Sequence, residues 1–168
     1  GIKMKKLLVI ISMFMVFLVG YGKNAEINVR KGAKLPSFEL MDFNRTKIKS
    51  HKILNNGNPT LLVFVAEWCP HCQHELPEIQ RFYEENKDSV NVAVVFISKN
   101  TTMADSKKFI DENGFTFPVY YDLDRSLINA FKIKSVPYNL KIQNSVIQDI
   151  QNGVVSYDKL SELFSSGN

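Results

Sequence analysis

Residues 67–74 read EWCPHCQH and contain both cysteines of the 168-residue chain, together with two of its three histidines. Cys69 and Cys72 are separated only by Pro70 and His71. These residue types support three kinds of chemistry: a structural disulfide, a metal site with cysteine and histidine ligands, or a redox dithiol. The surrounding elements decide which of the three the segment can perform.

A structural disulfide between Cys69 and Cys72 would close a very small loop, for which the chain-entropy model gives little stabilisation. A copper or zinc site would use four side chains of the segment: Cys69, His71, Cys72 and His74. Four ligands on one helix turn cannot readily surround a tetrahedral ion, and His51 supplies no second ligand pair elsewhere. A redox dithiol is therefore favoured, and a metal-binding accessory protein is the alternative from another class.

The segment lies between a predicted strand and a predicted helix. Residues 60–66 form a continuous apolar run, typical of a strand buried on both faces, and a helical pattern then continues to about residue 87. Cys69 would sit at the helix amino end, where unpaired N–H groups and the helix dipole stabilise an anion. We expect Cys69 to be the nucleophilic thiolate and Cys72, one turn inward, the shielded resolving thiol.

Strand-like and helix-like segments alternate along the remainder of the chain. Further predicted elements are a hairpin turning at 42–46, a strand at 91–98, a helix at 102–114, a strand at 117–122, a short helix at 124–133, a hairpin turning at 143–145 and a helix at 157–164. The helix at 102–114 has Thr102 and Asp105 in capping-box spacing and ends at Gly114. The alternation predicts an α/β fold with a central mixed β-sheet flanked by helices.

The motif FVAEWCPHC, followed far downstream by SVPYN at residues 135–139, resembles the thioredoxin superfamily. The resemblance implies a thioredoxin-like fold in which Pro137 is cis and faces the cysteines. Val136 and Pro137 would then offer backbone groups that hold a partner segment in extended form. The N-terminal hairpin and the helix–strand insertion at about 102–121 are similar to the exported TlpA/ResA-like branch, which implies thiol–disulfide exchange with exported proteins.

Glu75, three residues after Cys72, matches a position at which that branch often carries an active-site carboxylate. The spacing places it one helical turn from the inner thiol, where it could exchange a proton, although a solvated helix glutamate would show the same spacing. Pro77 matches the kink proline of the thioredoxin helix. Thioredoxins carry a buried acid where this chain has Val63, which leaves Glu75, a histidine or water as the proton acceptor.

The dipeptide Pro70–His71 is typical of strongly oxidising DsbA-type proteins. An imidazole beside the Cys69 thiolate would stabilise the reduced form and make the disulfide a better oxidant. The branch instead favours a reductase that serves an apocytochrome or another exported client. The residue chemistry slightly favours the oxidising direction, with a reductase as the alternative.

The predicted site therefore has two groups of residues and a redox disulfide between Cys69 and Cys72. The catalytic group is Cys69, Cys72, Glu75 and His71, and the substrate-binding group is Trp68, Pro70, Val136 and Pro137. We expect no cofactor and no resident metal. A peroxiredoxin is less favoured, because no Pro/Thr-rich approach leads to a lone peroxidatic cysteine.

The first 22 residues have the pattern of a secretory signal, with three lysines before an apolar run and small residues after it. In LVGY, Tyr21 occupies the place of a lipoprotein cysteine. We expect residues 1–22 to be a signal peptide or N-terminal membrane anchor, residues 23–35 a linker and residues 36–168 the thioredoxin-like domain. This domain would be extracytoplasmic, secreted or tethered to the outer face of a bacterial cytoplasmic membrane.

The net charge of +4 is concentrated at the N-terminus. Residues 1–22 contain three lysines and no acidic residue, so 18 basic and 17 acidic side chains follow them. This balance indicates no nucleic-acid binding. We expect a monomer whose partners are exported proteins with thiols or disulfides, and a protein that recycles the cysteine pair. Membrane association could occur through the N-terminal segment.

Overall fold

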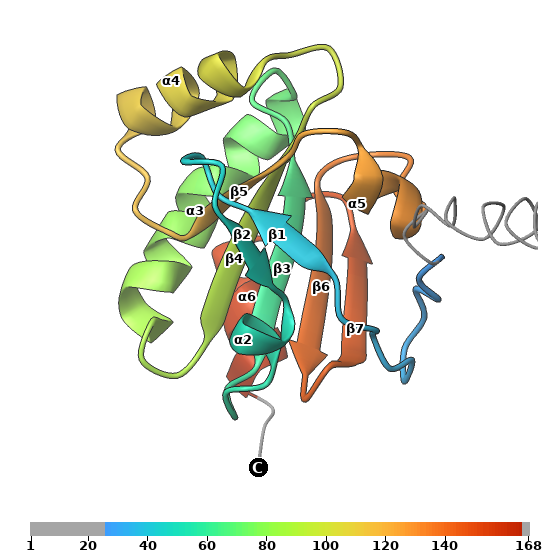
Figure 1. Cartoon of the computed structure of the whole chain (residues 1–168). Helices are drawn as coiled ribbons and strands as arrows, with labels where there is room; N and C mark the ends of the chain where they lie inside the picture. The colour runs from blue at the N-terminus through green and yellow to red at the C-terminus, as the bar shows by residue number, and fades with distance from the viewer. Residues whose placement is uncertain (1–25, 166–168) are drawn as a thin grey trace, which may run out of the picture.

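A five-stranded mixed sheet forms the centre of the computed structural model, which describes residues 26–165 (Figure 1). The strand order is β5-β4-β3-β6-β7, where β3 pairs in parallel with β4 and antiparallel with β6. The strands are β3 (Thr60–Val65), β4 (Asn91–Ile97), β5 (Val119–Asp122), β6 (Tyr138–Gln143) and β7 (Val146–Asn152). The predicted thioredoxin-like α/β fold is confirmed.

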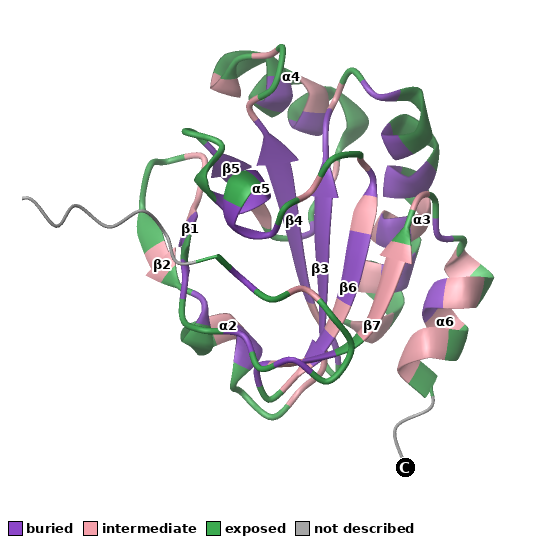
Figure 2. Cartoon of the chain, turned by 90° about the vertical axis from the view of Figure 1, so that its right-hand side faces the viewer, coloured by how far each residue is buried: buried purple, intermediate pink, exposed green. Residues whose placement is uncertain are grey.

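Helices cover both faces of this sheet (Figure 2). The helices are α2 (His51–Leu54), α3 (Pro70–Asn86), α4 (Met103–Asn113), α5 (Ser126–Ala130) and α6 (Tyr157–Ser165). Helices α3 and α6 lie on one face, and α5 lies on the other with the N-terminal hairpin (Figure 2). Every residue of β3 is buried, which explains why its sequence is apolar throughout rather than alternating.

Aromatic side chains fill the two layers of the core. On the hairpin side, Phe131 contacts Phe38 and Phe64 with ring centroids 5.3 and 5.2 Å apart. On the other side, Phe82 of α3 contacts Phe164 of α6 at 5.4 Å. Burial of rings of this size supplies a large share of the apolar area removed from water, so both layers are fixed against the sheet.

The N-terminal hairpin consists of β1 (Glu39–Met41) and β2 (Lys47–Lys49), which pair antiparallel as predicted. Its turn is held by Asp42, whose Oδ1 accepts hydrogen bonds from the N–H groups of Asn44 and Thr46, both at 2.8 Å. The short helix α2, which follows β2, was not predicted because four residues carry too little periodicity to be recognised.

The predicted helix–strand insertion is also present, as α4 and β5. Thr102 caps α4, since its Oγ1 accepts a hydrogen bond from the N–H of Asp105 at 3.1 Å. Gly114 ends the helix in the left-handed conformation at φ +66°, which a glycine adopts without steric cost. The capping signals in the sequence therefore predicted both ends of this helix correctly.

Residues 26–35, within the segment expected to be a linker, lie against the folded core. Ile27 and Leu35 are buried. The N–H of Ile27 donates to the carbonyl of Ala130 at 2.9 Å, and that of Leu35 donates to the carbonyl of Ser145 at 2.6 Å. Packing therefore begins before the expected start of the domain at residue 36.

The predicted signal segment, residues 1–22, lies outside the described residues. Among residues 26–165, no helix is both long and apolar enough to cross a membrane.

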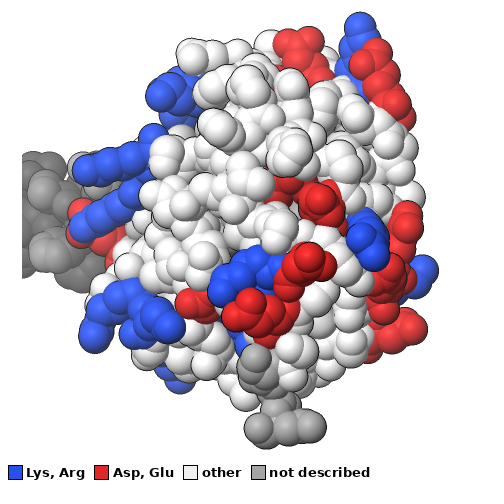
Figure 3. All heavy atoms as spheres, turned by 180° about the vertical axis from the view of Figure 1, so that it is seen from behind, with Lys and Arg blue, Asp and Glu red and all other residues white. Residues whose placement is uncertain are grey.

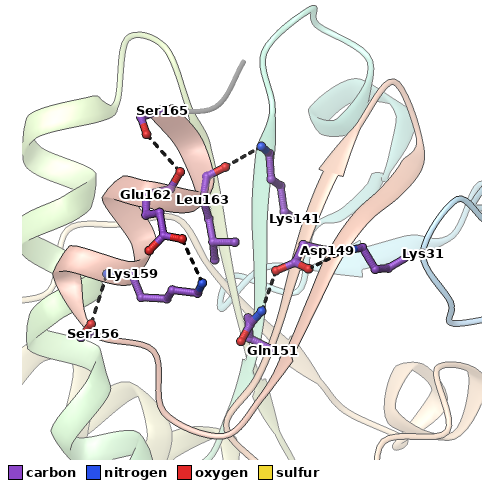
Figure 4. A network of polar contacts seen from close by, with 9 residues as sticks. All are labelled: Lys31, Lys141, Asp149, Gln151, Ser156, Lys159, Glu162, Leu163 and Ser165. Carbon is purple, nitrogen blue, oxygen red and sulfur yellow. Dashed lines mark hydrogen bonds and ion pairs between the residues drawn. The ribbon is translucent and has the colours of Figure 1, made fainter. Parts of the chain in front are cut away.

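Polar contacts fasten α6 and the N-terminal segment to the sheet (Figure 4). Lys141 of β6 donates to the carbonyl oxygen of Leu163 in α6 at 2.5 Å, and its ammonium lies 5.4 Å from the ring centroid of Phe164. Lys31 pairs with Asp149 of β7 at 3.4 Å. The Lys141 contacts fix the position of α6 and hence of the segment that leads into it, and the Lys31 pair holds the N-terminal segment against β7.

Candidate active site

Helix α3 begins at the dithiol motif. Cys69 is its N-cap residue, and the Cys69 sulfur accepts a hydrogen bond from the Cys72 N–H at 3.3 Å. Pro70 occupies the first helical position, where its missing N–H costs nothing. Strand β3 ends at Val65, and the chain then reaches the amino end of α3 at Cys69. The helix dipole there favours a negative charge on the Cys69 sulfur, as predicted.

The two cysteines, both free thiols, differ in their surroundings. The Cys69 side chain is 5% exposed and donates a 3.6 Å hydrogen bond to the carbonyl oxygen of Val136. Cys72 is fully buried. Burial raises the pKa of the Cys72 thiol above its ordinary value, and the hydrogen bond with Cys69 and the nearby charge of Glu75 raise it further. Cys69 is therefore the thiol that an incoming sulfur can reach.

The loop before β6 faces the thiol, as the resemblance implied. The Val136–Pro137 peptide bond is cis, and the Val136 carbonyl oxygen is the acceptor for Cys69. Pro137 itself is buried, whereas Val136 is partly exposed. The structure therefore brings Val136 and Cys69 together across an interval of 67 residues.

Glu75 is fully buried beneath the dithiol, so it is not a solvated helix glutamate. Its Oε1 accepts hydrogen bonds from the Val155 N–H at 2.6 Å and from the Asn139 Nδ2 at 2.9 Å. Burial raises the pKa of this carboxyl to about 7, although the two hydrogen bonds oppose the shift. Glu75 can therefore bind and release a proton near neutral pH.

Two buried side-chain oxygens in the described part of the chain have no hydrogen-bond partner, and they belong to Glu75 and Asn139. They are the Oε2 atom of Glu75 and the Oδ1 atom of Asn139. A proton on Glu75 would turn one of these two acceptors into a donor, which would relieve part of the cost of burying them. The pair therefore favours the neutral acid. Sequence reasoning missed Asn139, whose only signal was an amide inside a buried strand.

His71 and His74 are both exposed, on the first turns of α3, while Cys72 is fully buried. The four side chains considered for a copper or zinc site therefore do not share a common environment. Within residues 26–165, no group of three or more His, Cys, Asp or Glu side chains is placed to hold a metal ion.

The loop between β3 and α3 is held by the insertion. The Glu67 carboxylate accepts hydrogen bonds from Thr101 and from Ser106 of α4, the latter at 3.0 Å. Trp68 is 43% exposed, and its indole N–H donates to the Lys99 carbonyl at 2.8 Å. Burial raises the pKa of Glu67. The Glu67 contacts could not be predicted from the sequence, because they join residues of separate elements.

A groove of about 480 Å³ opens beside the Cys69 sulfur. Trp68 and Cys69 line it, together with Ser135 and Val136 of the loop that contains the cis proline. Of the four predicted substrate-binding residues, Trp68 and Val136 line this groove. Pro70 is exposed on α3, and Pro137 is buried behind the loop.

Comparisons with known proteins agree with this geometry. Residues 31–157 match the AhpC/TSA family. The chain is 30% identical over 157 residues to the thiol-disulfide oxidoreductase ResA of Oceanobacillus iheyensis, covering 92% of this chain and 81% of that protein. It is 27% identical to the sporulation thiol-disulfide oxidoreductase A of Bacillus subtilis, covering 94% of this chain and 96% of that protein.

Among solved structures, that of StoA from Bacillus subtilis superposes with a TM-score of 0.66 at 28% identity, covering 76% of this chain and 95% of that one. A DsbE-like protein from Chlorobium tepidum reaches a TM-score of 0.70 at 22% identity, over 81% of this chain and 94% of that one. The reachable thiol at a helix amino end, the buried thiol behind it and these likenesses lead to one conclusion. The chain belongs to the AhpC/TSA family of thioredoxin-like proteins, within which it is a thiol–disulfide oxidoreductase of the ResA and StoA type.

Proposed function

We propose that this enzyme exchanges disulfides with exported proteins outside the cytoplasm, using Cys69 as the attacking thiol and Cys72 as the resolving thiol. One observation carries the proposal: the Cys69 sulfur faces a groove, whereas Cys72 is fully buried one helical turn behind it. The signal-like pattern of residues 1–22 supports the location outside the cytoplasm. A partner protein would recycle the cysteine pair.

In the reducing direction, the Cys69 thiolate attacks one sulfur of a client disulfide. The client S–S bond breaks, a mixed disulfide forms, and the leaving sulfur takes up a proton. The Cys72 thiolate then attacks the Cys69 sulfur, which releases the second client thiol and forms the Cys69–Cys72 disulfide. Two electrons pass to the client, and the oxidising direction is the same sequence in reverse.

Glu75 serves the second step in this proposal. The raised pKa of Cys72 keeps its thiol protonated at neutral pH, so the attack on Cys69 requires a base. The Glu75 carboxyl, with a pKa of about 7, is buried with Cys72 on α3 and can accept that proton. Val155 and Asn139 would hold the carboxyl in place through their hydrogen bonds.

We favour the oxidising direction slightly, on account of His71. Its imidazole lies on the first turn of α3, between the two cysteines in sequence, in a turn without an acidic side chain. A positive charge there would stabilise the reduced thiolate and make the disulfide more oxidising. The reduction potential measures this balance directly: a value near −120 mV indicates an oxidase, and one near about −270 mV a reductase.

The His71→Gln protein is expected to be more reducing, with a potential lower by roughly 30 mV or more, which corresponds to about tenfold in the exchange equilibrium. Equilibration with glutathione at several ratios gives this value. His74→Gln is the matched control, because it removes an exposed imidazole one helical turn farther from Cys69. An unchanged or more oxidising potential in His71→Gln would remove the argument for an oxidase.

A further inference from the structure

The groove beside Cys69 is lined by three cationic side chains and by no acidic one. Lys99 follows the end of β4, Arg125 precedes α5, and Lys134 lies in the loop before the cis proline. All three are exposed, and none forms an ion pair with any residue between 26 and 165. Their charges are therefore available to a molecule that enters the groove.

These cations are a local feature and do not reflect a basic protein. Residues 26–165 contain 17 basic and 17 acidic side chains, so the described part of the chain has no net charge. On the face that carries α3 and α6, acidic and basic side chains are intermixed (Figure 3). Asp124, which is next to Arg125 in sequence, lines two neighbouring hollows and not the groove itself.

The remaining surface of the groove is largely apolar. Its lining includes Ile97 and Ile128, which are buried, and Ile133 and Val136, which are partly exposed. Trp68 adds an exposed indole beside the Cys69 sulfur. A lining that combines apolar side chains with three cations fits a ligand that offers an apolar side chain and carboxylates together.

We infer that the groove selects client segments in which aspartate or glutamate residues, with an apolar residue, flank the reacting cysteine. This inference rests on the proposed exchange at Cys69, and it adds the chemical class of the client. The cations would attract such a segment during encounter, and the groove would hold it while its sulfur meets Cys69. A client with lysines at the same positions would be repelled.

The test compares two peptides as substrates. Each contains one cysteine in a mixed disulfide with glutathione, and the cysteine is flanked either by two glutamates and a leucine or by two lysines and a leucine. The reduced enzyme is expected to react about tenfold faster with the acidic peptide at low ionic strength. The difference should shrink in 0.5 M salt, because exposed charges are then screened. Equal rates at low salt would overturn the inference.

Reversing the charges of two groove cations tests whether these side chains cause the preference for the acidic peptide. In the Arg125→Glu/Lys134→Glu protein the preference is expected to reverse toward the basic peptide. The control is Lys52→Glu/Lys87→Glu, which changes the net charge equally at exposed lysines of α2 and of the carboxyl end of α3. These lysines form no described ion pair and do not line the groove. An unchanged preference in the groove variant would refute the assignment to these side chains.

A neutral substrate separates this inference from the proposed function. Hydroxyethyl disulfide carries no charge, so the unmodified enzyme and the Lys52→Glu/Lys87→Glu protein should react with it at the same rate. If the unmodified enzyme reacts with hydroxyethyl disulfide but does not distinguish the peptides, only the client class is wrong. If it reacts with none of the three substrates, the proposed exchange at Cys69 fails as well.

Discussion

The Cys69→Ala protein is expected to lose disulfide exchange entirely, down to the background rate of the solution reaction. Cys69 is the only one of the two thiols that reaches the groove, and Cys72 is fully buried. No other cysteine is present in the chain to replace it. Reduction of a glutathione-linked peptide, followed by fluorescence or mass spectrometry, measures the loss.

The Cys72→Ala protein is expected to behave differently and to accumulate mixed disulfides. Without the resolving thiol, the first attack by Cys69 still proceeds, but the linked client can leave only by reaction with an external thiol. Non-reducing electrophoresis and intact-mass measurement detect the adduct. Full activity in Cys72→Ala together with trapped clients in Cys69→Ala would show that the roles of the two cysteines are reversed.

The second large effect concerns Glu75. In the unmodified enzyme the rate of the resolving step should rise with pH through about 7, where the Glu75 carboxyl loses its proton and becomes a base. In Glu75→Gln this inflection should disappear, and the rate at pH 7 should fall by about 100-fold. Stopped-flow release of the second client thiol gives the profile. Persistence of the inflection near pH 7 in Glu75→Gln would exclude Glu75 as the base.

The same substitution should alter the pH dependence of stability. The folded pKa of about 7 lies above the ordinary value of 4.5, so between these two pH values the unfolded chain releases a proton that the folded protein retains. The free energy of unfolding should therefore fall as pH rises across this window, by on the order of 3 kcal/mol, and then level off.

Urea unfolding at pH 4.5 and pH 8 measures this change. Glu75→Gln should lack the decrease, because glutamine carries no charge and its amide can still accept from Val155. The matched control is Glu78→Gln on the same helix, where the side chain is partly exposed; this protein should keep the decrease. A decrease of the same size in Glu75→Gln would assign the effect to another group.

The features that the sequence predicted correctly are those encoded in short stretches of chain. The apolar run of β3, the capping residues of α4 and the final hairpin each depend on neighbours within a few residues. The placement of Cys69 at a helix amino end followed from the same local patterns, because Pro70 opens a helix directly after a strand. The cis bond before Pro137 was expected only through the resemblance.

The features that were missed depend on contacts between distant segments. Asn139 donates a hydrogen bond to Glu75 from 64 residues away in sequence, and the Val155 N–H donates one from 80 residues away. Neither separation leaves a pattern in the sequence. The cations of the groove come from three separate loops for the same reason. The packing of residues 26–35 depends on the edge strand β7, which is distant in sequence. Their polar composition showed nothing of these contacts and therefore suggested a linker.

The hydrogen bond from Val155 to Glu75 has a practical consequence for anyone who modifies this enzyme near its C-terminus. Val155 lies in the turn before α6, and α6 is fastened to the sheet through the contact between Lys141 and Leu163. Shortening α6, or attaching a bulky tag that displaces it, would move a proton-donating backbone group away from a carboxyl beneath the dithiol. A change made at the periphery would then be observed as a changed pH optimum.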